Sequence, residues 1–170
     1  MMDSSVHKQL HFKSVNAENR REVEGLTVFS EQAGFIESVS ECLREADELE
    51  LWRPVGIYDS DTLIGFAMYG YFPEPAPGQL WLDRLLIDKR YQGKGYGKQA
   101  VLSLLDRLHT EYQSGTVYLS VYENNPHAIK LYNRLVSGLT GNTIARGNIS
   151  WSIIFERCRA SQRSICAESS

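Results

Sequence analysis

The apolar residues of the chain repeat at two spacings, which predict a mixture of strands and helices. Residues 10–15 alternate apolar and polar side chains, as a strand with one buried face does. Between residues 19 and 49 the apolar residues recur every three or four positions, which predicts two helices separated near Gly34. One apolar stripe of this region consists of Ile36, Val39, Leu43, Ala46 and Leu49.

The middle of the chain predicts a hairpin followed by a central strand. Residues 54–59 and 63–72 are apolar runs joined by the turn-forming sequence Asp-Ser-Asp, so we expect them to pair with each other. The proline-rich segment 73–78 reads as a loop. Residues 80–87 then form a largely apolar run, which is typical of a strand buried on both faces.

Two further helices flank one more strand. A helix should follow residue 97, because Ala100, Val101 and Leu104 begin an apolar face that continues to Leu108. Residues 116–122 read as a strand, and residues 125–135 as a short helix with Asn125 as its N-cap. The order strand, helices, hairpin, strand, helix, strand, helix predicts one mixed α/β domain.

Composition narrows the class of protein. A chain of 170 residues is long enough for one domain with a proper core, and its net charge of -3 argues against a nucleic-acid partner. The sequence shows neither an apolar run long enough to span a membrane nor a signal peptide. Its three scattered cysteines lack metal-type spacing and suit a reducing cytoplasm. We therefore expect a cytoplasmic protein without a metal site.

Three glycines at alternate positions stand between the strand at residues 80–87 and the next helix. Gly93, Gly95 and Gly97 are interleaved with Lys94 and Lys98. A helix N-terminus presents unpaired N–H groups and a positive dipole, and glycines let that backbone curl around an anion. The spacing is neither that of a P-loop nor that of a dinucleotide fingerprint. An ordinary turn with solvated lysines is the alternative, and the flanking strand and helix favour anion binding.

Several motifs in order resemble the GNAT N-acetyltransferases. The stretch RYQGKGYGKQAV, with Gln-x-x-Gly-x-Gly from residue 92 to 97, resembles the pyrophosphate-binding motif of that family. YENNPHAIKLYNRL resembles the family's next motif, in which an asparagine opens a helix and a tyrosine lies seven residues on. With WLDRLLID and residues 54–74, the pattern is similar to the bacterial spermine/spermidine acetyltransferases of the family and covers residues 8–135.

The resemblance implies a V-splayed mixed sheet with acetyl-CoA in the splay. It implies direct transfer of the acetyl group to an amine, with a polyamine such as spermidine or spermine as the favoured acceptor, and it allows a homodimer. The pyrophosphate would lie on the backbone of Gln92, Gly93, Lys94, Gly95, Tyr96, Gly97 and Lys98. The pantetheine arm would pair with Leu85, Leu86 and Ile87, and Asn125 would hydrogen-bond it.

Two residues are candidates for proton transfer. A protonated amine is not a nucleophile, and Asp83 stands where the polyamine acetyltransferases carry a carboxylate that could accept its proton. A strand partner of Arg84, or a surface charge, is an equal alternative for Asp83. Tyr132 lies where the family places the general acid that protonates the leaving thiolate. A core aromatic is its alternative, and the asparagine seven residues earlier favours the acid.

Other polar groups carry weaker signals. Acidic residues give the helical region before the hairpin a negative face that would suit a polycation, although a solvated helix face is the favoured explanation for each of them taken singly. These residues are Glu37, Glu41, Glu45, Asp47, Glu48 and Glu50. His127 reads as a surface residue of its helix.

The resemblance stops at Leu135 and divides the chain into a catalytic domain at 1–135 and a divergent tail at 136–170. Codons compatible with the tail permit the family's Gly-Phe pair in the neighbouring reading frame, which suggests a translated frameshift. We then expect the strand at 116–122 to lack a partner and the tail to be poorly ordered, apart from a short strand around residues 149–155.

Two other functions fit the sequence. One is acetylation of another small amine or of a peptide amine. The other is a degenerate, non-catalytic acetyl-CoA-binding protein, a reading that the divergent tail favours.

Overall fold

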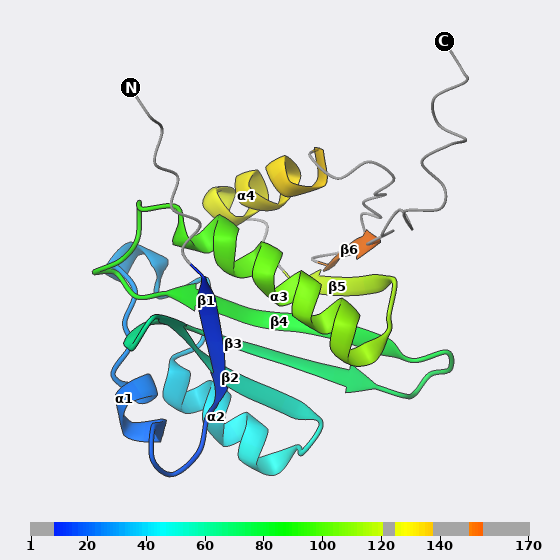
Figure 1. Ribbon diagram of the computed structural model, residues 1–170, viewed down its shortest axis with the longest axis horizontal. Helices are drawn as coiled ribbons and strands as arrows, with labels where there is room; N and C mark the ends of the chain where they lie inside the picture. Colours follow the sequence, from blue (N-terminus) through cyan, green and yellow to red (C-terminus); the bar gives the residue numbers. More distant parts are fainter. Residues whose placement is uncertain (1–8, 121–124, 138–149, 155–170) are drawn as a thin grey trace.

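The computed structural model describes residues 9–120, 125–137 and 150–154, which form a six-stranded sheet in the order β1 to β6 (Figure 1). All neighbouring strands are antiparallel except β4 and β5, which are parallel. The strands are β1 (Leu10–Ser14), β2 (Trp52–Asp59), β3 (Thr62–Phe72), β4 (Gln79–Ile87), β5 (Thr116–Ser120) and β6 (Ser150–Ile154).

Helices cover both faces of this sheet (Figure 1). On one face lie α1 (Arg20–Glu24) and α2 (Val39–Glu48), and a short 3₁₀ turn, η1 (Ser30–Gln32), precedes α2. On the other lie α3 (Tyr96–Tyr112) and α4 (Pro126–Ser137). Each pair of helices buries its own apolar cluster against the sheet, so the predicted mixed α/β fold is confirmed.

The helical region before the hairpin differs from its prediction. The first helix ends at Glu24 with Gly25 as its C-cap, and the next α-helix begins only at Val39, because the backbone after Gly25 pairs with the end of β4. The N–H of Thr27 donates to Asp88 Oδ2 at 3.0 Å, and the N–H of Lys89 donates to the Thr27 carbonyl oxygen at 2.8 Å. The apolar stripe is also shorter than predicted, since Leu49 follows the last residue of α2 and is 40% exposed.

A β-bulge in β4 shapes the centre of the sheet. Met68 of β3 pairs with Arg84 and Tyr69 with Leu82, so Asp83 is the extra residue. The bulge reverses the alternation of side chains, which puts Leu82 in the core beneath α3 and Arg84 toward α2. β4 pairs with the described part of β5 only at Trp81 and Leu82. In the part of the chain that the structure describes, β5 ends at Ser120, and a cavity opens beside the remainder of β4.

The C-terminal tail supplies a strand, which corrects one prediction. The short strand expected around residues 149–155 is present as β6, and it pairs with β5 along Thr116–Ser120. The expectation that the strand at 116–122 lacks a partner is therefore wrong for residues 116–120. An open strand edge accepts any extended segment through backbone hydrogen bonds, whatever its side chains. The rest of the tail prediction lies outside the described residues.

Candidate active site

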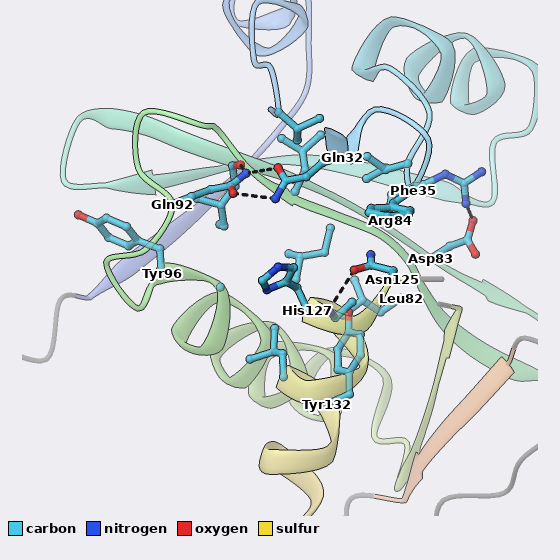
Figure 2. A pocket seen from close by; sticks show the side chains of 18 of the residues that line it. Gln32, Phe35, Leu82, Asp83, Arg84, Gln92, Tyr96, Asn125, His127 and Tyr132 are labelled. Atoms are coloured by element: carbon cyan, nitrogen blue, oxygen red, sulfur yellow. Dashed lines mark hydrogen bonds and ion pairs between the residues drawn. The ribbon is translucent and has the colours of Figure 1, made fainter. Parts of the chain in front are cut away.

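A cavity of about 530 Å³ opens beside the C-terminal half of β4. Its walls come from β4, the glycine loop, α4 and the segment between η1 and α2. Gln32, Gln92 and Tyr96 stand at one end, and Asp83 and Arg84 at the other (Figure 2). The predicted site residues that line it are Asp83, Leu85, Leu86, Ile87, Gln92, Gly93, Gly95, Tyr96, Gly97, Asn125 and Tyr132.

The three glycines serve two different purposes. Gly93 and Gly95 have φ angles of 74° and 83°, a left-handed backbone that other residues adopt only with strain. Gly97 has no such φ, and a Cβ added there would meet only Leu131 Cδ2, at 3.8 Å. No neighbour within the described residues excludes a side chain at Gly97, so its glycine keeps the space in front of α3 open.

The loop is held by contacts with distant parts of the sheet. The Tyr96 hydroxyl donates to Asp59 Oδ2 at 2.5 Å, which fixes the start of α3 to the end of β2. Asp88, directly after β4, is 1% exposed and accepts hydrogen bonds from Thr27 N–H and from Arg90. Burial opposes ionisation of Asp88, but the hydrogen bonds from Arg90 and Thr27 outweigh it and lower the pKa of this carboxyl group.

A reciprocal pair of amides closes this end of the cavity. Gln92 Nε2 donates to Gln32 Oε1 at 2.8 Å, and Gln32 Nε2 donates to Gln92 Oε1 at 3.0 Å (Figure 2). Gln92 Nε2 also donates to the Ile87 carbonyl oxygen at 2.9 Å. Sequence reasoning missed Gln32, because no local spacing connects two residues that lie 60 positions apart. It also missed Asp88, which looks like the end of a strand.

The two lysines of the loop lie outside the cavity lining. Lys94 and Lys98 are exposed, and Lys94 Nζ lies 5.6 Å from the centre of the Tyr91 ring. These lysines can therefore interact with a bound anion only from the rim of the cavity. The polar groups that the loop offers directly are its backbone N–H groups, which is the arrangement expected at a helix N-terminus.

The start of α4 brings its own residues to the cavity. Asn125 Oδ1 accepts a hydrogen bond from Ala128 N–H at 3.1 Å, so Asn125 is the predicted N-cap. Because the helix uses this oxygen, the amide –NH₂ is the group that Asn125 can offer to a ligand. His127, predicted as a surface residue, is exposed but also lines the cavity (Figure 2).

Tyr132 points from α4 into the cavity (Figure 2). The residue is 8% exposed, and burial raises its pKa to about 12. The phenol therefore keeps its proton throughout the neutral and moderately alkaline range. A group in this state can donate a proton or a hydrogen bond to a developing negative charge, but cannot act as a base.

Asp83 combines the two alternatives considered for it. It lines the cavity, and its Oδ2 is also in direct contact with Arg84 Nη1 (Figure 2). The bulge explains this contact, because it places two successive charged residues opposite a single residue of β3. The Asp83 carboxylate therefore lines the cavity and pairs with Arg84 at the same time, and its role as a proton acceptor stays a prediction.

The comparison with known proteins bears directly on this arrangement. The sequence pattern of the acetyltransferase (GNAT) family matches residues 16–136. A spermine/spermidine N(1)-acetyltransferase from Bacillus subtilis is 45% identical over 129 residues, which cover 74% of this chain and 85% of that protein. The chain belongs to the GNAT family of acetyltransferases.

Solved structures of GNAT enzymes share the fold. The spermidine N-acetyltransferase from Vibrio cholerae, solved with CoA and spermine, has a TM-score of 0.59 at 19% identity and covers 85% of this chain and 92% of its own. The ribosomal-protein-S18-alanine N-acetyltransferase from Escherichia coli has a TM-score of 0.60 at 17% identity, with coverage of 89% and 98%. At these identities the likeness establishes the fold alone.

The cavity has the features that the family's donor, acetyl-CoA, requires. The loop N–H groups and the open space at Gly97 fit a pyrophosphate, and Leu85, Leu86 and Ile87 of β4 line the cavity where an extended arm would run. Among the described residues no group of His, Cys, Asp and Glu is arranged to hold a metal ion. No helix in the described ranges is long and apolar enough to cross a membrane.

Proposed function

We propose that this enzyme transfers the acetyl group of acetyl-CoA to a primary amine of a polyamine such as spermidine or spermine. The observation that carries the proposal is one cavity with two unlike ends. One end offers helix N-terminal backbone for a pyrophosphate, and the other is walled by the carboxylates of Glu37 and Asp83. The 45% identity to a spermine/spermidine acetyltransferase supports the choice of a polyamine.

In this proposal the donor is bound mainly by backbone. The backbone of residues 92–98 receives the pyrophosphate, and Leu85, Leu86 and Ile87 pair with the extended arm as an added strand would. The Asn125 amide group hydrogen-bonds the same arm. A backbone N–H at the end of β4 polarises the thioester carbonyl as negative charge develops on its oxygen.

Two side chains handle protons. Tyr132, neutral because burial raises its pKa to about 12, donates a proton to the departing thiolate. Asp83 accepts the proton of the incoming ammonium group, directly or through water.

Thiol release from acetyl-CoA tests the proposal. The purified chain should release free thiol in the presence of spermidine and not in its absence, and mass spectrometry should find monoacetylated spermidine. Release with a peptide N-terminus or a short monoamine, but not with spermidine, would replace the polyamine by another acceptor. Acetyl-CoA binding without release for any amine would show a non-catalytic protein.

Residues 1–135 form the catalytic domain in this proposal, and residues 136–170 are a translated frameshift. The family match ends at residue 136, which supports the division. Restoring the neighbouring frame in the coding DNA should give a Gly-Phe pair after Leu135 and a more stable, more active enzyme. Failure to find that pair would end the frameshift hypothesis.

Location and assembly complete the proposal. A cytoplasmic location suits an enzyme that draws on the cell's acetyl-CoA, and fractionation of cells that express the chain would test it. Sedimentation equilibrium would decide whether the homodimer allowed by the family forms.

A further inference from the structure

Arg84 is surrounded by carboxylates at the acidic end of the cavity. Its Nε lies 2.8 Å from Glu37 Oε2, its Nη2 lies 3.4 Å from Glu45 Oε2, and its Nη1 contacts Asp83. The Arg84 side chain is only 15% exposed. The partners come from three places, namely the segment before α2, α2 itself and the bulge of β4.

These three carboxylates do not occupy equivalent positions. Glu37 and Asp83 line the cavity, whereas Glu45 does not and reaches only the guanidinium. Glu45 thus contacts Arg84 on the side away from the cavity lining. Arg84 in turn contacts the two carboxylates that line the cavity. Without a cation between them, Glu37 and Asp83 would repel each other and move apart.

The charge at this end does not balance. Three carboxylates and one guanidinium leave a net charge of two negative units, from three minus one. Arg84 is the one Lys or Arg residue in the described lining of the cavity. This excess negative charge can attract a cation. The side chains of Glu37 and Glu45 are accessible to one, since they are 40% and 42% exposed.

Resting on the proposed function, we propose that Arg84 is a positioning residue that sets the specificity for the acceptor. It holds Glu37 at the cavity wall as the site for an ammonium group of the acceptor that does not react, and it holds Asp83 beside that site, where Asp83 receives the proton of the reacting amine. The enzyme therefore selects amines that carry a second positive charge over monoamines of the same length.

The chemistry favours the distal ammonium group over the reacting one. The reacting amine must lose its proton before it can attack the thioester. A group of carboxylates with excess negative charge stabilises the protonated form of a bound amine, which suits a group that stays charged. Glu37 thus contributes mainly to binding, whereas Asp83 remains the proton acceptor of the proposed function, and Tyr132 reaches the cavity from α4.

Steady-state kinetics with two matched acceptors test this assignment. 1,4-Diaminobutane and butylamine have the same chain length and differ by one ammonium group. Glu37→Gln should raise the KM for the diamine about tenfold while kcat stays nearly unchanged, and should alter butylamine kinetics little. Arg84→Gln should reduce the preference for the diamine similarly, and Arg84→Lys should restore part of it because it keeps the charge but not the fork of donors.

Glu48→Gln is the matched control, because it removes the same charge from an exposed position of α2 outside the cavity lining. It should change neither acceptor's kinetics. If Glu37→Gln and Arg84→Gln slow both acceptors by the same factor, Arg84 only ties α2 to β4, and the assignment is wrong. Unchanged diamine kinetics in Glu37→Gln would also overturn it.

Calorimetry separates this inference from the proposed function. Spermidine should bind the unmodified chain and bind Glu37→Gln about tenfold more weakly, whether or not turnover occurs. If no amine is acetylated but this binding difference is found, the cation site is supported and the proposed function is refuted. If spermidine is acetylated but binds the unmodified chain and Glu37→Gln equally, the proposed function is supported and the role of Glu37 and Arg84 is refuted.

Discussion

The two ends of the cavity differ in which atoms form them, since one consists of backbone and the other of charged side chains. The glycine end is made of backbone, with two left-handed glycines and the N-terminus of α3, which the hydrogen bond of Tyr96 to Asp59 fixes to β2. The acidic end is made of side chains, in which one guanidinium gathers carboxylates from three parts of the chain. A backbone site is damaged when a side chain fills its space or strains its φ angles, whereas a side-chain site changes with a single charge.

This difference suits the two substrates of a transferase. The donor is the same molecule in every turnover, and a fixed backbone cradle binds it without the entropy cost of ordering long side chains. In the proposed function the acceptor is bound by side chains, so its recognition can change by substitution of Glu37 or Arg84 without disturbing the cradle. Variants at the two ends should therefore affect different ligands.

Gly97→Glu should have the largest effect. The added carboxylate would occupy the open space in front of α3 and repel a pyrophosphate, so acetyl-CoA binding should be lost while the fold survives. Calorimetry with acetyl-CoA measures this loss, and circular dichroism checks the fold. Leu102→Glu, on an exposed face of the same helix, is the control and should bind normally. Unchanged affinity in Gly97→Glu would reduce the glycine loop to a simple turn.

Tyr132→Phe should act on turnover and not on donor binding. The change keeps the ring and its packing but removes the proton, so kcat should fall roughly tenfold to a thousandfold. Acetyl-CoA affinity should stay within experimental error of the parent. An equal kcat in the two proteins would remove Tyr132 from the mechanism and leave it as a core aromatic.

A pair of alanine variants separates backbone strain from open space. Gly95→Ala should lower the free energy of unfolding by about 1–2 kcal/mol, because Ala disfavours a φ of 83°. Gly97→Ala should leave stability nearly unchanged, since its Cβ would meet only Leu131 at van der Waals distance. Urea unfolding measures both. Equal losses of stability would mean that the two glycines serve the same purpose.

The smallest effect is expected at high pH. Burial raises the pKa of both Tyr69 and Tyr132 to about 12, whereas an unfolded tyrosine titrates near pH 10. The folded state then binds more protons than the unfolded state between about pH 10 and 12, so stability is fully present below pH 10 and falls across this interval. Thermal unfolding from pH 8 to 11 should show the decline, and Tyr69→Phe should reduce it. A Tm independent of pH in that range would contradict the burial argument.

Local patterns predicted the glycine end well. The strand, the glycine spacing and the helix that follows are adjacent in sequence, and the N-cap at Asn125 likewise depends on residues within three positions. The helix at 125–135 and the short strand near residue 150 could be found for the same reason. The partner of that strand could not, because pairing between β5 and β6 depends on the path of the chain between them.

The acidic end required the folded chain. The bulge at Asp83 is invisible in an apolar run such as LWLDRLLI, and without it Arg84 would face the opposite side of the sheet. Glu37 was one of six equivalent acids in the sequence. The structure distinguishes it from Glu41, which caps α2 through Ser38, and from Asp47, which pairs with Arg20. Gln32 and Asp88 were missed because their partners are 60 and 61 residues away.

A cross-titration measures whether each end of the cavity binds one of the two substrates. Acetyl-CoA and spermidine are titrated separately into the parent chain, Gly97→Glu and Glu37→Gln. We expect Gly97→Glu to lose its affinity for acetyl-CoA and to bind spermidine normally. Glu37→Gln should bind acetyl-CoA normally and spermidine more weakly. If either variant loses both ligands while remaining folded, or if neither variant changes either affinity, the division of the cavity into a donor end and an acceptor end is wrong.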